Sequence, residues 1–396
     1  MNQLDHWLLP DGVEDLLPTT AAKLEWARQK LLHLFSSWGY DYVMPPKLEF
    51  IDSLLTGTGK DLDLQTVKVI DQISGRLMGL PADITPQVAR IDAHSMGGEG
   101  VSRLCYAGSV VRARPEGFIG SRTPIKVGAE LFGDAEPKSD LEIVSLMVSS
   151  LEALGLTEIH VELGDVSIFR RLMDRAHLDG ATKDEIFELI QKKANHSLAS
   201  ATQLKIDDAS LAEKINRLPS LCGDLTVLEE AKVLFSDQTE LLDSVARLRK
   251  LSTGLLNRYP NLKISVDLSE LRGFNYHTGA VFAAYDAMSG QIVSRGGRYD
   301  NVGELFGRSR PATGFDIEIS NLVDLLPASE SQPRVVISRS ESADEQIQSS
   351  MLWSKIEALR AEGYRVIEGK PPAGFAGYQL VFDANEWVLK ASKEGN

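Results

Sequence analysis

Apolar residues first recur with a clear period near the start of the chain. Between residues 19 and 38 they keep one face of a helix apolar, and Gly39 ends the predicted helix. Residues 40–46 then read as a strand that is halted by two prolines. Any amphipathic helix that is followed by a strand would give this pattern, so these two elements alone assign no role to the chain.

Strand patterns dominate the next part of the chain. Residues 65–79 are expected to form a β-hairpin that turns at Gly75. Residues 104–111 and 127–133 are expected to form two further strands joined by a polar loop. This alternation favours an antiparallel sheet, because short connections join neighbouring antiparallel strands.

A long helical region follows. Ser139–Glu142 reads as a capping box for a helix that Gly155 stops, and residues 159–163 alternate as a strand. Residues 165–259 then show helical patterns without a strand signal, up to a proline at 260. Helix starts are predicted at Asp165, at a second capping box Thr182–Glu185, at Asp207 and at Asp224.

The last third of the chain returns to strands. Residues 264–268 predict a strand, residues 311–322 a strand followed by a helix, and residues 334–396 a small α/β module after a linker at 327–333. We therefore expect an α+β protein with a discontinuous core at 1–164 and 260–327, a helical insertion at 165–259 and a C-terminal α/β module at 333–396.

Composition narrows the choice of partners. Hydrophobic residues make up 43% and charged residues 25% of the chain, which is ordinary for a globular protein that lies outside the membrane. The net charge of −14 argues against nucleic acid as a main partner, because phosphate-binding proteins normally carry basic patches. Cys105 and Cys222 lie far apart without metal-ligand spacing, so we expect no metal and a reduced cytoplasmic location.

Candidate chemistry concentrates in residues 271–282. Arg272 lies at a glycine-containing turn, where a guanidinium can bind a carboxylate or phosphate through two hydrogen bonds. Tyr276 and His277 offer polar groups to a ring or an amide, and Gly296–Gly297 lets the backbone approach a ligand closely. A β-hairpin with polar turns is an equally good interpretation of this spacing.

A second candidate is the segment around Asp83. Asp83 and Thr85 are expected to share one side of an extended segment, where they would bind an ammonium group, and Pro86 would start the next helix. A threonine helix cap next to a solvated aspartate fits the same residues.

These stretches resemble the two histidine-specific signatures of histidyl-tRNA synthetases, Arg-Gly-Leu-Asp-Tyr-Tyr and Gly-Gly-Arg-Tyr-Asp. The similarity covers about residues 6 to 326 and implies a class II aminoacyl-tRNA synthetase-like core, an antiparallel sheet flanked by helices. Residues 19–46 are similar to motif 1, a dimer element, residues 104–133 to motif 2, and residues 311–322 to motif 3. The amino-acid sequence of residues 271–279 is closer to that of one non-synthetase branch, the regulatory subunits of short-form ATP phosphoribosyltransferase.

The resemblance implies a binding site for L-histidine. The residues that it assigns are Asp83 and Thr85 for the amino group, with Lys126 in place of a nearby glutamine; Arg112 and Arg272 for the carboxylate; and Glu130, Tyr276 and His277 for the imidazole.

The groups that hold ATP in the synthetases are replaced. Counted without gaps, Arg114 stands for the adenine-reading glutamate and Pro124 for the stacking phenylalanine of motif 2. Asn321 stands for the arginine of motif 3 and carries no charge to clamp a phosphate. A proline has no π face and an arginine accepts no hydrogen bond. We therefore expect a chain that binds histidine without adenylating it.

The branch implies a noncatalytic regulatory subunit in the first step of histidine biosynthesis. Its expected partner is the short-form catalytic subunit, in a hetero-octamer built from dimers of each subunit, with L-histidine as allosteric inhibitor and no cofactor. A diverged class II ligase that holds ATP through Arg114 or Arg122 is the alternative. An authentic histidyl-tRNA synthetase is disfavoured by the acidic charge and by a C-terminal module that is short for an anticodon-binding domain.

Overall fold

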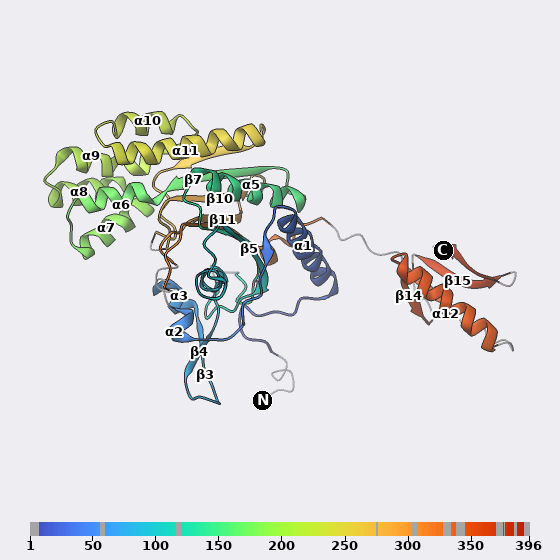
Figure 1. Ribbon diagram of the computed structural model, residues 1–396. Coiled ribbons are helices and arrows are strands. Elements are labelled where there is room, and N and C mark those ends of the chain that lie inside the picture. The colour runs from blue at the N-terminus through green and yellow to red at the C-terminus, as the bar shows by residue number, and fades with distance from the viewer. Residues whose placement is uncertain are drawn as a thin grey trace. The chain divides into compact units, whose positions relative to one another are not determined.

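The computed structural model divides the chain into two compact units, Met1–Pro327 and Ala328–Asn396 (Figure 1). No helix among the described residues is long and apolar enough to span a membrane. The structure describes every residue except 1–7, 56–59, 116–119, 275, 303–306, 328–333, 338–344, 370–374, 376, 384–385 and 392–396.

The described part of the first unit is built on a nine-stranded sheet, in the order β1-β5-β6-β12-β11-β10-β7-β9-β8. Its central strands pair antiparallel, whereas β1 pairs parallel with β5 and β7 pairs parallel with β9. The predicted α+β class is confirmed. The strands are β1 (Asp41–Tyr42), β5 (Ser102–Ser109), β6 (Ile125–Phe132), β7 (Ile159–Asp165), β8 (Cys222–Gly223), β9 (Lys263–Asp267), β10 (Ala280–Asp286), β11 (Ile292–Arg298) and β12 (Ala312–Glu318).

Two helices, α1 (Pro18–Ser37) and α5 (Pro137–Ala153), cover one face of this sheet. Odd-numbered residues of β6 and β12, such as Ala129 and Phe315, belong to the apolar core beneath them. The Phe35 ring of α1 meets the Phe315 ring edge-on, with centroids 5.9 Å apart. Because side chains alternate along a strand, the even-numbered residues point to the opposite face.

A separate three-stranded sheet, in the order β2-β4-β3, contains the predicted hairpin. The turn between β3 and β4 lies at Gly75, which has a φ of +71°. Asp71 accepts hydrogen bonds from the amides of Ile73 and Ser74 and so fixes the turn. The elements of this region are β2 (Glu49–Phe50), α2 (Ile51–Leu54), α3 (Lys60–Gln65), β3 (Val67–Ile70), β4 (Leu77–Leu80), α4 (Thr85–Arg90) and a π-helical turn (Ile91–Met96).

Between β7 and β9 the chain forms a bundle of helices (Figure 1). The longest, α11, packs along α5, and Gly254 allows this approach because a Cβ there would lie 2.7 Å from the side chain of Leu141. The helices are α6 (Val166–Arg175), α7 (Gly180–Gln191), α8 (Asn195–Lys205), α9 (Ala209–Arg217), a 3-10 turn (Leu218–Ser220), α10 (Val227–Leu234) and α11 (Thr239–Arg258).

Both predicted capping boxes are wrong. The helix at residue 180 is capped by Asp179, whose carboxylate accepts from the Thr182 amide, so Thr182 lies inside the first turn. The helix near Ser139 starts two residues earlier at Pro137. Both helices begin upstream of the predicted cap. Asp179 caps the first, and Pro137 occupies the first helical position of the second, a position that suits proline. The predicted start at Asp165 is confirmed, since its carboxylate accepts from the Ser167 amide at 2.9 Å.

Three other elements differ from their prediction. The helical region contains the two-residue strand β8, which pairs with β9 and is too short to leave a pattern. Of residues 40–46, only Asp41 and Tyr42 form a strand. After β12 the chain forms a single 3-10 turn, η5 (Ile319–Leu322), where a helix was expected.

The second unit contains a four-stranded sheet, in the order β14-β13-β15-β16, with one helix packed on it. Leu352, Ile356 and Leu359 of the helix lie against Val335 and Leu380 of the sheet. The last strand was not foreseen. Residues 328–333 of the predicted linker lie outside the described residues. The elements are β13 (Arg334–Ile337), α12 (Glu345–Ala361), β14 (Arg365–Glu368), β15 (Tyr378–Asp383) and β16 (Glu386–Ala391).

The junction of β7 and α6 generates a prediction about stability. The buried Asp165 caps α6 and forms an ion pair with Arg247 at 3.2 Å, whereas Asp208 caps α9 at an exposed position. Loss of an exposed cap costs about 1 kcal/mol. Asp165→Ala should lower the free energy of unfolding in urea by ~2 kcal/mol or more, because the Ser167 amide that it leaves without a partner is buried. An equal loss for Asp165→Ala and Asp208→Ala would contradict this reasoning.

Candidate ligand-binding site

The face of β6 and β12 that carries their even-numbered residues borders a cavity of about 630 Å³. Strand register aligns its floor: Glu130, Gly128 and Lys126 of β6 lie opposite Gly314, Asp316 and Glu318 of β12. All of the predicted site residues line this one cavity, namely Asp83, Thr85, Arg112, Lys126, Glu130, Arg272, Tyr276 and His277.

Glu130 lies at one end of this floor and is almost fully buried. Its carboxylate accepts a hydrogen bond from the Thr85 hydroxyl at 2.9 Å and another from the Tyr299 hydroxyl. Burial raises the pKa of Glu130 to about 8, although both hydrogen bonds oppose the shift. Near neutral pH this carboxyl group is therefore mostly protonated, so it can donate a hydrogen bond to a ring nitrogen as well as accept one from a ring N–H.

Glycines make room for this buried acid. A Cβ at Gly314 would lie 1.5 Å from a carboxylate oxygen of Glu130, and one at Gly128 would lie 2.5 Å from the hydroxyl of Tyr106. Tyr106 in turn lies 3.1 Å from the Thr85 hydroxyl. Both positions must be glycine, because the side chains of Glu130 and Tyr106 occupy the space that a Cβ would need.

Lys126 lies at the other end of this floor from Glu130. Its ammonium lies 3.1 Å from Asp83 and 2.9 Å from Asp316. Burial opposes the charge of Lys126, but the two carboxylates outweigh it and raise its pKa. Burial likewise opposes the charge of Asp83, yet Lys126 lowers the pKa of that carboxyl group. Asp83 was expected to bind the ammonium group of a ligand, but in the structure it forms an ion pair with the ammonium group of Lys126.

The expected extended segment at residues 83–85 is wrong. Ile84 has helical backbone angles and Thr85 is the first residue of α4. The two side chains therefore diverge within the cavity, Asp83 to Lys126 and Thr85 to Glu130.

The two arginines of the site also have carboxylate partners. Arg112 is buried and forms an ion pair with Glu318 through both of its terminal nitrogens. Arg272 lies at the half-exposed mouth, 2.7 Å from Glu270, and its guanidinium also reaches the Tyr285 hydroxyl at 3.4 Å.

Tyr276 and His277 form an aromatic wall. The Tyr276 ring lies 4.9 Å from that of Tyr299 and 5.3 Å from that of His277. Within the described part of the chain, the Tyr276 hydroxyl and Nδ1 of His277 are buried without a hydrogen-bond partner. Burial lowers the pKa of His277 to about 4, so its imidazole is neutral.

Glycines and an arginine hold this wall in place. A Cβ at Gly273 or at Gly297 would lie within 2.8 Å of the His277 ring, so the ring fills the space between them. Arg170 of α6 donates hydrogen bonds to the carbonyls of Phe274 and His277, at 3.0 and 2.8 Å. The helical segment thus fixes the loop that carries Tyr276.

Several site residues were not predicted. Tyr299 was visible within Gly-Gly-Arg-Tyr-Asp but was given no role. Asp316 and Glu318 could have been found from strand alternation, since they follow Gly314 at intervals of two residues and must share its face. Glu270 and Arg170 left no pattern that indicates their contacts.

Comparison with known proteins assigns the family. The histidyl-tRNA synthetase family model matches residues 12–322. An ATP phosphoribosyltransferase regulatory subunit of Saccharophagus degradans is 45% identical over 93% of this chain and 92% of its own length. One of Azotobacter vinelandii is 44% identical over 98% and 99%. The chain belongs to the ATP phosphoribosyltransferase regulatory subunit family.

Solved structures agree with this family membership. A Bacillus halodurans protein, described as an ATP phosphoribosyltransferase regulatory subunit/histidyl-tRNA synthetase, has a TM-score of 0.79 at 25% identity, over 91% of this chain and 93% of its own. A histidyl-tRNA synthetase from Nostoc has a TM-score of 0.76 at 17% identity, over 97% of each chain. The predicted family and the class II synthetase-like fold are confirmed.

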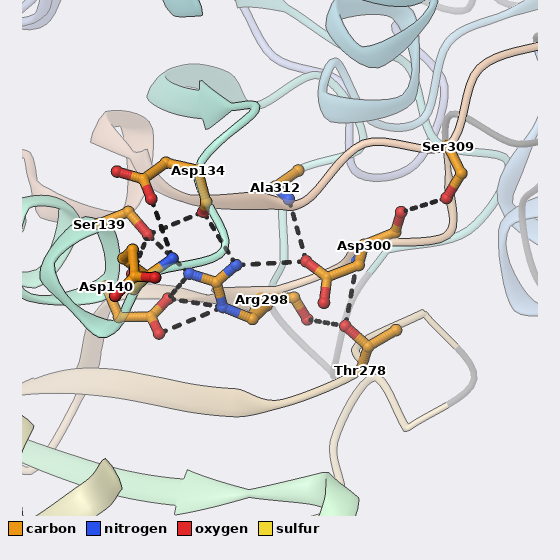
Figure 2. Close-up of polar contacts among 9 residues, drawn as sticks. Asp134, Ser139, Asp140, Thr278, Arg298, Asp300, Ser309 and Ala312 are labelled. Carbon is orange, nitrogen blue, oxygen red and sulfur yellow. Dashed lines mark hydrogen bonds and ion pairs between the residues drawn. The ribbon is translucent and has the colours of Figure 1, made fainter. Parts of the chain in front are cut away.

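In this family member, Arg298 of the Gly-Gly-Arg-Tyr-Asp signature lies outside the cavity. Figure 2 shows its guanidinium between the carboxylates of Asp140 and Asp300, with the Ser139 hydroxyl 2.7 Å away. Asp300 also accepts from the Ala312 amide at 3.1 Å. Arg298 ties β11 to the start of α5, and so positions the next residue, which donates to Glu130.

The raised pKa of Glu130 generates a prediction about pH. The folded protein keeps this proton up to about pH 8, whereas an unfolded glutamate loses it near 4.5. Between these values the folded state binds more protons, so the free energy of unfolding falls as pH rises, by at most about 1.4 kcal/mol per pH unit. Glu130→Gln should flatten this slope in urea unfolding between pH 5 and 8. Parallel slopes for the two proteins would contradict the raised pKa.

Proposed function

We propose that this chain is the noncatalytic regulatory subunit of a short-form ATP phosphoribosyltransferase, which activates the catalytic subunit and binds L-histidine as a feedback inhibitor. The observation that carries the proposal is the cavity around Glu130. Its lining includes a buried acid, Glu130, and two arginines, Arg112 and Arg272. Family membership supports the regulatory role.

The part of the cavity around Glu130 suits an imidazole. Glu130 supplies a carboxyl group, and Tyr276 and Tyr299 supply ring faces beside it. An imidazole carries one N–H donor and one acceptor when neutral, and two donors when charged. A carboxyl group with a pKa of about 8 pairs with either form.

Other charged residues of the cavity suit the ends of an amino acid. Arg112 and Arg272 are the cations available to a carboxylate, and Asp83 with Asp316 are the anions available to an ammonium. A guanidinium binds a carboxylate through two parallel hydrogen bonds, which fixes its orientation as well as its charge.

The same cavity is poorly suited to ATP. Asn321 donates a hydrogen bond to Glu318 at 3.0 Å, so a neutral amide and a carboxylate stand where a triphosphate needs cations. Pro124 offers no ring to adenine, and Arg114 is exposed. These replacements support a noncatalytic role, with the chemistry on ATP assigned to the partner.

The partner and assembly follow from the family resemblance. We propose a hetero-octamer of two dimers of this chain with two dimers of the catalytic subunit, in the cytoplasm. The net charge of −14 supports a protein partner in preference to nucleic acid. Feedback requires only that histidine favour the less active arrangement, by a coupling free energy of typically 1–3 kcal/mol.

The decisive experiment measures transferase turnover. The short catalytic subunit is assayed with ATP and phosphoribosyl pyrophosphate, alone, with this chain, and with this chain plus histidine. The rate should rise when the chain is added and fall again with histidine. If neither step changes the rate, the regulatory role is wrong, and ATP–pyrophosphate exchange with histidine then tests the ligase alternative.

Site variants separate binding from activation. Glu130→Gln and Arg272→Ala should raise the histidine concentration for half-inhibition by about tenfold or more, because each removes a hydrogen-bonding partner that the proposal assigns to the ligand. Activation without histidine should change less than about twofold, since neither side chain is assigned to the subunit contact. Glu158→Gln, an exposed acid paired with Lys263, is the matched control and should leave both unchanged. Unaltered histidine sensitivity in Glu130→Gln would remove Glu130 from the site.

A further inference from the structure

Two ion pairs of the cavity contain the two charged groups of an amino acid, a carboxylate and an ammonium. Glu318 presents a carboxylate to Arg112, and Lys126 presents an ammonium to Asp83. Lys126 and Glu318 lie directly opposite each other on β6 and β12. The chain therefore supplies one carboxylate and one ammonium at the positions that a bound amino acid would claim.

We propose that Glu318 is an internal competitor for the ligand's carboxylate and sets the affinity and selectivity of the site. The inference rests on the proposed function, since it concerns the same cavity. A zwitterionic amino acid binds by exchanging partners: its carboxylate replaces Glu318 on Arg112, while its ammonium replaces Lys126 on Asp83.

The geometry of the Glu318 pair supports this role. Both carboxylate oxygens face the terminal nitrogens of Arg112, as the oxygens of a bound ligand would. The Glu318 side chain is 18% exposed and that of Arg112 is 9% exposed, so solvent screens the pair little. A ligand carboxylate must therefore displace a strong contact before it gains its own.

The displaced carboxylate has a second partner. Asn321 of η5 donates a hydrogen bond to Glu318 at 3.0 Å. Glu318 can keep this hydrogen bond when it leaves Arg112, which lowers the cost of the exchange. Lys126 likewise retains Asp316 at 2.9 Å when it gives up Asp83. Each internal competitor thus keeps one contact in the occupied state.

Selectivity follows from the balance of charge. On the floor, the carboxylates of Asp83, Asp316 and Glu318 face the cations of Lys126 and Arg112. A zwitterion exchanges one charge of each sign and leaves this balance unchanged. A phosphate anion brings only negative charge into an acidic, partly buried region, where like charges repel strongly. Glu318 therefore excludes polyphosphates from the cavity, although it also weakens the binding of histidine.

The test measures binding by calorimetry and thermal unfolding of the full chain. Glu318→Gln removes the competing charge, so histidine should bind at least about tenfold more tightly, the order expected for one close charge pair. The melting temperature without ligand should fall, because the buried Arg112 loses its anion. The increase in melting temperature caused by histidine should become larger. A purely structural role would lower the melting temperature without improving histidine binding.

Two controls isolate the charge of Glu318. Glu318→Asp keeps the negative charge, so its dissociation constant for histidine should stay within about threefold of that of the unaltered protein. Glu158→Gln removes an exposed acid and should change nothing. Inorganic pyrophosphate should bind Glu318→Gln measurably better than the unaltered protein.

The outcomes distinguish the two proposals. If the unaltered protein binds no histidine, the proposed function fails and the competitor role falls with it. If the unaltered protein binds histidine but Glu318→Gln binds it equally or more weakly, the competitor role alone is overturned. Equal tightening in Glu318→Gln and Glu318→Asp would also overturn it, because the cause would then be shape and not charge.

Discussion

The burial of Glu130 is the constraint on which the cavity depends. A carboxyl group in this position needs donors, and two come from distant parts of the chain: Thr85 at the start of α4 and Tyr299 just after β11. A third segment, Gly314 of β12, leaves the space for the carboxyl group. Each element must therefore be placed accurately for the acid to be tolerated. The antiparallel register of β6 and β12, which sets Glu130 opposite Gly314, makes this arrangement possible.

The second constraint is the balance of the buried charges. An unpaired ion in this floor would cost several kcal/mol, so each charge needs a counter-charge even when no ligand is bound. The ion pairs of Lys126 with Asp83 and Asp316, and of Arg112 with Glu318, meet that need. Under the proposed function, the affinity for an amino acid is then a difference between two sets of ion pairs. The proposed sensor role benefits from such moderation, because a site that is always occupied reports nothing.

The sequence predicts elements that have a period and residues that carry a motif, and it fails where contacts cross the chain. Strand alternation located β6 and β12, and the family resemblance gathered eight residues that do line one cavity. The start at Asp165 was predicted correctly, whereas the start at Thr182 was not, because Asp179 caps that helix three residues earlier. The partner of Arg112 lies 206 residues away, and no local pattern reports such a pairing. The family resemblance assigned Asp83 to the ammonium group of a ligand. Nothing in that resemblance indicated that Lys126 would already form an ion pair with Asp83.

Neighbouring residues of one signature serve the two faces of the sheet. Arg298 lies opposite Thr313 and reaches Asp140 on the side of α5 (Figure 2). Tyr299 lines the cavity and donates to Glu130. The chain therefore places a structural anchor and a cavity-lining hydroxyl back to back, one peptide unit apart. For the proposed regulatory role, this pair of contacts is a route by which the packing of α5 on β11 would influence the position of the hydroxyl that holds Glu130.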